Sequence, residues 1–280
     1  MDYKIDNKLI GICDNKKNNP IPLYLIKDIN SLKLTSLISE KQKIFLKSTF
    51  NLELENFGFF PDENNHLGGA VAIITETIEP RKSIIDQAAK LSEKLPKKKW
   101  ALECLDELNN QETYNFILGW GLSFYKFNIK PNNKRSDINQ TLCIKKIKDL
   151  ITEHEFQKCC AELKGIFLAR DLINLPPNIL TPYNYEKIVK NCFKDFCTKI
   201  DAYKDKKLEK NFPLINFVGR SSENKPLLLD IKWSKSKKNN FPNITLIGKG
   251  VTFDSGGLDV KPSSGMMLMK KDMGGSAVVL

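Results

Sequence analysis

The sequence lacks the features that mark secreted, membrane and zinc-ribbon proteins. No apolar run approaches the ~20 residues needed to cross a bilayer, and the N-terminal segment Met1–Asp6 has no apolar core of a signal peptide. None of the seven cysteines stands in a C-x-x-C pair, so a zinc ribbon is excluded and free thiols are the simplest account. We therefore expect a cytoplasmic protein in a reducing environment, with no membrane association.

Histidine is scarce as well. The chain has two histidines, His66 and His154, and neither stands in an H-E-x-x-H or similar metal-binding frame. His154 lies between two glutamates and is expected on the exposed face of a helix. Neither histidine is a candidate metal ligand.

Acidic residues are outnumbered, since 44 Lys+Arg against 33 Asp+Glu give a net charge of +11. Such a charge attracts nucleic acid or acidic lipid. However, the lysines are spread along the chain together with many Asn and Ile residues, and no lysine run is interleaved with aromatic residues as a base-stacking groove requires. A nucleotide- or nucleic-acid-binding module in residues 1–140 stays open as an alternative function.

The length and the pattern of apolar residues predict two α/β domains. A chain of 280 residues exceeds the ~100–200 residues of one typical domain, and strands alternate with helices along it. We predict a boundary within a polar linker at 128–141, which gives domains at 1–140 and 141–280. The predicted strands are 23–26, 43–46, 68–74, 100–102, 227–233 and 243–248, and the predicted helices are 83–95, 111–127, 151–174 and 181–199.

Helix boundaries are best marked in the middle of the chain. Pro176 and Pro177 end the predicted helix that precedes them, and Thr181 followed by Pro182 begins the next one as N-cap and first helical residue. The strands at 227–233 and 243–248 are predicted to be joined by a lysine-rich hairpin or edge connection.

Chemistry is concentrated between Ile247 and Leu280. The segment follows a predicted strand, where ligand sites of α/β folds gather. Six of its seven glycines permit tight turns and close approach of backbone to a ligand: Gly248, Gly250, Gly256, Gly257, Gly274 and Gly275. Carboxylate oxygens suit hard divalent cations. The charged residues set among these glycines are Lys249, Asp254, Lys261 and Asp272.

A phosphate loop is a weaker interpretation of this segment. Such a loop requires G-x-x-x-x-G-K-[ST], whereas Lys249 precedes most of the glycines here. Taken singly, Asp254 is typical of a turn, Asp272 of a solvated helix and Met269 of a core. Taken together, at these spacings, they favour a functional site.

Three ordered blocks resemble the leucyl aminopeptidase (cytosol aminopeptidase) family of metallopeptidases, peptidase family M17. The first block is the charged segment, whose intervals of 5, 7 and 11 residues along Lys249, Asp254, Lys261 and Asp272 agree with the family's signature. Residues 169–182 resemble the entry into the catalytic domain, and residues 212–220 resemble a further block. The resemblance covers 165–280 well and 1–140 loosely.

This resemblance implies a dinuclear metal site and a role for each residue. Asp254 would bridge two divalent ions, Mn²⁺ or Zn²⁺, and Lys249 and Asp272 would bind the same ion of the pair. Lys249 would have to be neutral, which burial and a nearby dication favour. Lys261 would stay charged and stabilise the oxyanion that develops on the peptide carbonyl. Met269 would line the pocket for the first side chain of the substrate.

The resemblance also implies a fold and partners: an α/β protein with a macro-like N-terminal α/β domain, an incomplete α/β catalytic domain with a mixed sheet, peptide substrates and a homo-hexamer. Members carry an Asp-x-Glu block followed by an arginine that holds bicarbonate as a base, and this chain ends at Leu280 before that block. We therefore expect an aminopeptidase sequence, truncated at its C-terminus, whose isolated chain is inactive and poorly stable. An inactive remnant of such an enzyme is the other possibility.

Overall fold

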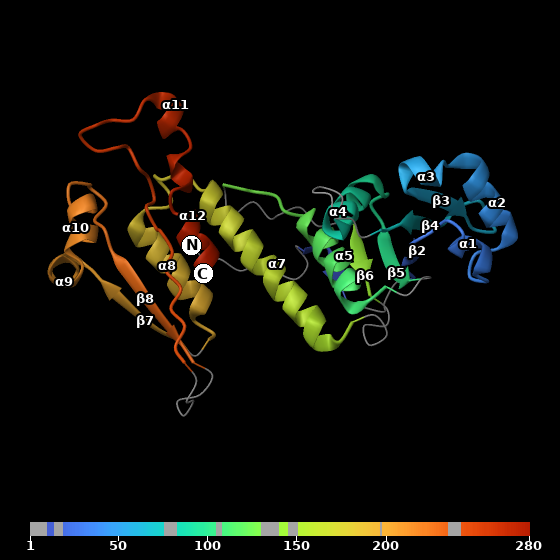
Figure 1. Cartoon of the computed structure of the whole chain (residues 1–280), viewed down its shortest axis with the longest axis horizontal. Coiled ribbons are helices and arrows are strands. Elements are labelled where there is room, and N and C mark those ends of the chain that lie inside the picture. Colours follow the sequence, from blue (N-terminus) through green and yellow to red (C-terminus); the bar gives the residue numbers. More distant parts are fainter. Residues whose placement is uncertain are drawn as a thin grey trace. The chain divides into compact units, whose positions relative to one another are not determined.

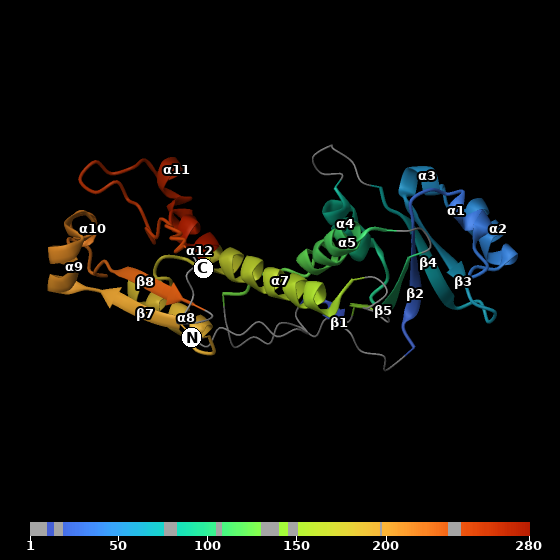
Figure 2. The same ribbon diagram turned by 60° about the horizontal axis from the view of Figure 1, so that its bottom comes forward.

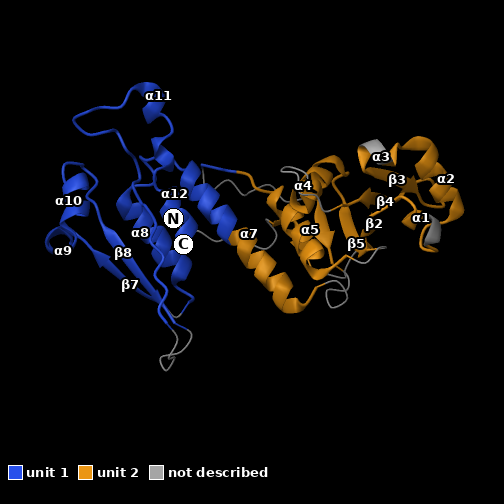
Figure 3. Ribbon diagram, in the orientation of Figure 1, with its two compact units in different colours: residues 1–5, 127–133, 165–280 blue, residues 6–126, 134–164 orange. Residues whose placement is uncertain are grey.

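The structure is a computed structural model that describes residues 10–13, 19–75, 83–104, 108–129, 140–144, 151–196, 198–234 and 242–280. The chain divides into two compact units, shown in different colours in Figure 3. The N-terminal unit comprises residues 6–126 and 134–164. The C-terminal unit comprises residues 1–5, 127–133 and 165–280. Within the described ranges, no helix is both long and apolar enough to cross a membrane.

The N-terminal unit is built on a six-stranded sheet with the order β1-β6-β5-β2-β4-β3. All neighbouring strands are parallel except β3, which pairs antiparallel with β4 at the edge. The sheet is therefore mixed, and the α/β class is confirmed. The strands are β1 (Ile12–Cys13), β2 (Ile21–Ile26), β3 (Phe57–Pro61), β4 (Leu67–Ile73), β5 (Lys99–Cys104) and β6 (Thr141–Cys143).

Helices cover both faces of this sheet. On one face, Tyr24 and Val71, which are partners in the β2–β4 register, pack with buried side chains of α1 and α2. On the other side lie α4 and α5, as Figures 1 and 2 show. Burial on two faces explains why the central strands read as continuous apolar runs. The helices are α1 (Ser31–Leu34), α2 (Glu40–Thr49), α3 (Leu52–Glu55), α4 (Ile84–Lys94) and α5 (Asn110–Leu122).

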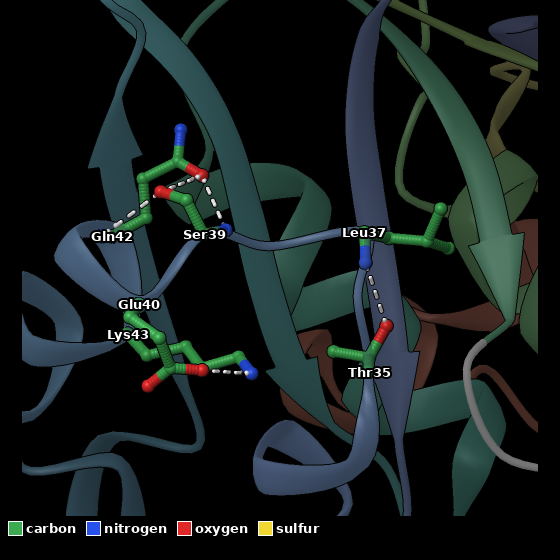
Figure 4. Close-up of polar contacts among 6 residues, drawn as sticks. All are labelled: Thr35, Leu37, Ser39, Glu40, Gln42 and Lys43. Carbon is green, nitrogen blue, oxygen red and sulfur yellow. Dashed lines mark hydrogen bonds and ion pairs between the residues drawn. The ribbon is translucent and has the colours of Figure 1, made fainter.

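The predicted strand at 43–46 is wrong, because these residues lie inside α2. Ser39 caps this helix: its Oγ accepts from the Gln42 backbone N–H at 3.4 Å, and the Gln42 side chain accepts from the Ser39 backbone N–H at 3.0 Å. Figure 4 shows this reciprocal capping box, with the Lys43–Glu40 ion pair beside it. The cap fixes the first helical turn, and this outweighs the strand preference of a short apolar run.

The C-terminal unit combines helices with an antiparallel pair of strands. Strands β7 (Thr198–Tyr203) and β8 (Leu228–Trp233) pair with each other. Ile200 and Leu229 from this pair pack against a core that includes Leu172, Ile188 and Met273. The helices are α7 (Glu153–Asn174), whose first part belongs to the N-terminal unit, α8 (Pro182–Phe193), α9 (Asp205–Asn211), α10 (Pro213–Gly219), α11 (Ser263–Met266), the short 3₁₀ helix η2 (Met269–Lys271) and α12 (Gly274–Val279).

The predicted strand at 243–248 is also wrong, and so is a hairpin with β8, which was one of the two predicted connections. The structure gives residues 242–250 no regular secondary structure. β8 pairs with β7 instead, and the apolar side chains of Ile244 and Ile247 are 85% and 91% exposed. An apolar run becomes a strand only where a neighbour completes its hydrogen-bond ladder, and the described strands offer this run no such neighbour.

Most other predicted elements are confirmed within a few residues. These include the strands at β2, β4, β5 and β8 and the helices at α4, α5 and α7. Thr181 caps α8 as predicted, accepting from the Asn184 N–H, but this helix ends at Phe193 and β7 begins at Thr198. Most of the predicted linker, residues 130–139, lies outside the described residues. β6 begins directly after the predicted domain boundary at 140, and that boundary stays a prediction.

Candidate metal centre

Lys249 is held in place by the beginning of α12. Its backbone oxygen accepts a 2.9 Å hydrogen bond from the Ser276 N–H, and the Ser276 hydroxyl in turn lies 2.8 Å from the hydroxyl of Tyr185 on α8. Gly248 permits this approach, because a Cβ at this position would lie 2.5 Å from the Ser276 Cα. The backbone of Lys249 is thus fixed by Ser276 of α12, whose hydroxyl is itself held by Tyr185 of α8.

Asp272 lies between η2 and α12 and faces Lys249. The Lys249 Nζ is 3.0 Å from the Asp272 Oδ1. The other carboxylate oxygen, Oδ2, is buried and has no hydrogen-bond partner among the described residues. Asp272 therefore does not stand on a solvated helix face. It presents a buried acceptor beside a cation.

Asp254 and Lys261 form the second charged pair. The Lys261 Nζ is 2.5 Å from the Asp254 Oδ2, and the Gly256 N–H donates to the Asp254 Oδ1 at 2.9 Å. Gly256 has φ of +91°, and a Cβ there would lie 2.2 Å from the backbone oxygen of Asp259. Only glycine fits this turn, so the turn that aims an N–H at Asp254 depends on Gly256.

Electrostatics connect the two pairs. The hydrogen bond from Lys261 is the largest influence that lowers the pKa of Asp254 below its ordinary value, followed by the Gly256 N–H, and the charge of Lys249 adds to the effect. The Lys261 Nζ also lies 3.6 Å from the Met269 Sδ. The structure thus brings all five predicted site residues into one neighbourhood, although their roles as ligands stay predictions.

The donor set fits a divalent cation. Two carboxylates and an amine are hard or borderline donors, and the buried Asp272 Oδ2 lacks a hydrogen-bond donor that a cation would replace. Yet the described residues contain no cluster of three or more His, Cys, Asp or Glu side chains. Within these ranges the aspartates are accompanied by lysines, so the set is suitable for a metal but small.

Sequence reasoning missed the residues that support this site. Gly256 was visible only as one of several glycines. Tyr185 and Ser276 are 91 residues apart, and no sequence signal joins them. Lys270 is a further case, since its Nζ donates to the Asn174 backbone oxygen at the end of α7 at 3.2 Å. Contacts of this kind depend on tertiary packing, which spacing along the chain does not reveal.

Comparison with known proteins agrees with the resemblance in these residues. The chain matches the cytosol aminopeptidase family, catalytic domain, over residues 167–280. Over this stretch the chain is similar to that catalytic domain. A Wolbachia pipientis wMel protein named "Probable cytosol aminopeptidase" is 36% identical over 159 residues, which is 56% of this chain and 32% of that protein.

Solved structures extend the likeness over nearly the whole chain. The crystal structure of cytosol aminopeptidase from Coxiella burnetii has a TM-score of 0.78 and 31% identity, and the match covers 95% of this chain and 55% of that one. The bottromycin maturation enzyme BotP in complex with Mn has a TM-score of 0.67 at 20% identity, which shows a shared fold. The chain thus matches about a third of the length of its curated relatives and about half of these structures.

Proposed function

We propose that the chain carries the first part of a dinuclear metal site of a cytoplasmic aminopeptidase, which releases leucine and other N-terminal residues from peptides. The observation that carries the proposal is a pair of neighbouring ion pairs, Lys249 with Asp272 and Lys261 with Asp254. The charge of Lys249 also helps to lower the pKa of Asp254, which links the two pairs. The match of residues 167–280 to the cytosol aminopeptidase catalytic domain supports the same activity.

In this proposal Asp254, Lys249 and Asp272 would hold the divalent ions of the site. Bound Mn²⁺ or Zn²⁺ supplies Lewis acidity and an activated water; the Mn complex of the BotP structure supports such a metal. The Asp272 Oδ2 is already buried and has no donor among the described residues, so binding a cation satisfies it. The Gly256 N–H fixes the orientation of the Asp254 carboxylate.

Lys261 acts on the substrate. Its ammonium group contacts the Asp254 carboxylate on one side and the Met269 sulfur on the other. An ammonium held in this way stabilises the negative charge that grows on the carbonyl oxygen as the peptide bond is attacked. Met269, beside it, offers a pliable apolar wall for the first side chain of the peptide.

The 280 residues alone are proposed to lack peptidase activity. The chain matches a third to a half of the length of its relatives, and the site offers two carboxylates where a dinuclear centre uses more. We infer that the remaining ligands, an arginine with its bicarbonate and the contacts of a homo-hexamer come from sequence that these 280 residues do not provide.

Metal titration of the chain tests the proposal. We expect Mn²⁺ or Zn²⁺ to bind, as measured by calorimetry, and Asp254→Asn or Asp272→Asn to weaken binding at least tenfold. Asp259→Asn is the matched control, because Asp259 is an exposed aspartate of the same loop. Equal affinity in all three variants, or no binding to the wild-type chain, would contradict the assignment and favour a remnant without metal function.

Hydrolysis of leucine p-nitroanilide tests the second part. With Mn²⁺ added, the wild-type chain is expected to show no turnover above the metal alone. Turnover like that of a full-length relative would show that these residues suffice, and it would overturn the inference that further ligands are needed.

A further inference from the structure

Two thiols at the edge of the six-stranded sheet lie unusually close to each other. The Cys13 Sγ and the Cys143 Sγ are 3.0 Å apart, and neither residue is in a disulfide. Cys13 is half-buried on β1, and Cys143 is buried on β6. They are direct partners in the parallel register of these strands, so both side chains stand on the same face of the sheet.

The spacing of the two strands permits a covalent bond between these residues. Neighbouring strands lie ~4.8 Å apart, which is within the Cα separations of ~4.4–6.8 Å that disulfides span. We propose that Cys13 and Cys143 form a reversible disulfide when the protein meets a disulfide oxidant of the glutathione type. The pair is a modification site separate from the candidate metal centre, and it does not depend on the proposed function.

The reaction is two successive thiol–disulfide exchanges. The thiolate of Cys13, the more accessible of the two, attacks one sulfur of glutathione disulfide, which forms a mixed disulfide and releases one glutathione thiolate. The Cys143 thiolate then attacks the Cys13 sulfur, which forms the Cys13–Cys143 bond and releases the second glutathione. The two protons that the cysteines lose are taken up by the two glutathione thiolates. The pair is oxidised by two electrons, and glutathione disulfide is reduced.

Cysteines elsewhere in the described ranges are less suited to this exchange. Burial, with Glu103 nearby, raises the pKa of Cys104 to about 12, and burial raises the pKa of Cys159 to about 12 as well. Both thiols are therefore poor first nucleophiles toward glutathione disulfide, the step that falls to the more accessible Cys13 in the proposed pair. Cys159 and Cys160 are adjacent on α7, where chain neighbours do not easily bridge.

The bond would secure the shortest described strand of the sheet. β1 has two residues and lies at the edge. The Leu142 N–H donates to Gly11 at 2.9 Å, and the Ile144 N–H donates to Cys13 at 3.1 Å. A disulfide would fix this short strand to β6 across 130 residues of sequence, and the gain in constraint grows with the length of the closed loop.

Peptide mapping of the intact chain tests the proposal. The reduced chain is treated with glutathione disulfide, remaining thiols are alkylated, and the protein is digested without reduction. We expect a cross-linked peptide that contains Cys13 and Cys143, with a mass about 2 Da below the sum of the two thiol peptides, and dithiothreitol should abolish it. If Cys143 is recovered alkylated, the proposal is overturned, whatever happens at Cys13.

Three variants separate the two steps. Cys143→Ser should trap Cys13 as its mixed disulfide with glutathione, because the second thiolate is missing. Cys13→Ser should leave Cys143 alkylated. Cys104→Ser, which changes a half-buried cysteine of β5 in the same sheet, should keep the cross-link. Loss of the cross-link in Cys104→Ser, or absence of a trapped adduct in Cys143→Ser, would contradict the mechanism.

Discussion

The sheet of the N-terminal unit and the site segment of the C-terminal unit are held in place in different ways. In the N-terminal unit the sheet is buried on both faces, and side chains such as Leu25, Trp100 and Phe116 are fully buried. In the C-terminal unit, the segment that carries Lys249 and Asp254 has no regular structure, and apolar side chains such as Ile247 are exposed. The comparison teaches that the site residues are positioned by a few directed contacts, whereas apolar burial positions the sheet.

Those directed contacts are few and specific. The Ser276 N–H donates to the Lys249 backbone oxygen, and the hydroxyls of Tyr185 and Ser276 are hydrogen-bonded to each other. The Lys261 N–H donates to the Ser255 backbone oxygen at 2.9 Å, which closes the turn below Asp254. A segment held in this way keeps its local geometry while its apolar side chains stay open to a partner or to more chain. This is consistent with relatives that are two to three times longer than the matched region.

The largest expected effect comes from a matched pair of leucines. Leu23→Ala on β2, where the side chain is fully buried, should lower the free energy of unfolding by about 2–5 kcal/mol, because it removes apolar contacts and leaves a cavity. Leu246→Ala, where the side chain is 68% exposed, should change it by less than about 0.5 kcal/mol. Urea denaturation measures both. Similar losses would show that the 242–250 segment is buried in solution and would remove the contrast between the units.

Much of the N-terminal unit could be predicted from the sequence, because buried strands and helices have recognisable patterns of apolar residues. The glycine pair before Ala70 and the apolar run through Ile73 gave a central strand, and Ile84 to Leu95 gave a helix at helical spacing. The error at 43–46 came from reading four apolar-rich residues without the Ser39 cap that precedes them. Local capping chemistry decided that element.

The charged residues of the site could be predicted from the sequence, but the residues that hold them in place could not. The family resemblance that Lys249, Asp254, Lys261 and Asp272 carry predicted that they gather, and two ion pairs join them in the structure. Spacing could not reveal that the run before Lys249 has no strand partner among the described residues. A strand depends on a neighbour elsewhere in the chain, and this information is not local.

A second, smaller effect is a dependence of stability on pH, which tests whether the core of the C-terminal unit excludes water as well as the core around the sheet does. Burial raises the pKa of Asp171 on α7 to about 7. Because the folded pKa exceeds the unfolded one, the folded state keeps a proton that the unfolded state has lost, and stability falls as pH rises from about 4 to 7. Between about pH 5 and pH 8 this should remove about 2–3 kcal/mol from the wild-type chain. Asp171→Asn should remove most of this difference in the free energy of unfolding, as measured by urea denaturation at the two pH values.

Glu186 on α8 provides the opposite control. Burial alone would raise its pKa, but the ammonium groups of Lys190 and Lys204 together hold the pKa below its ordinary value. Its contribution is therefore present above the unfolded pKa and is lost as pH falls through the folded one. Glu186→Gln should weaken the loss of stability on acidification and leave the slope above about pH 5 unchanged. A flat wild-type profile between about pH 5 and pH 8 would mean that water reaches Asp171 and that this core is looser than the sheet's.

The smallest expected effect concerns helix caps, one in each unit. The Asn109 side chain accepts from the Glu112 N–H at 2.8 Å at the start of α5, and the Thr181 side chain accepts from the Asn184 N–H at 3.3 Å at the start of α8. Asn109→Ala and Thr181→Ala should each cost about 1 kcal/mol, because each leaves a backbone N–H of the first turn without its acceptor. The bond to Asn109 is shorter and belongs to a capping box that Glu112 completes, so its loss should be the larger of the two. If Thr181→Ala instead costs more, α8 depends on its cap where α5 relies on burial, and the contrast between the units extends to single helical turns.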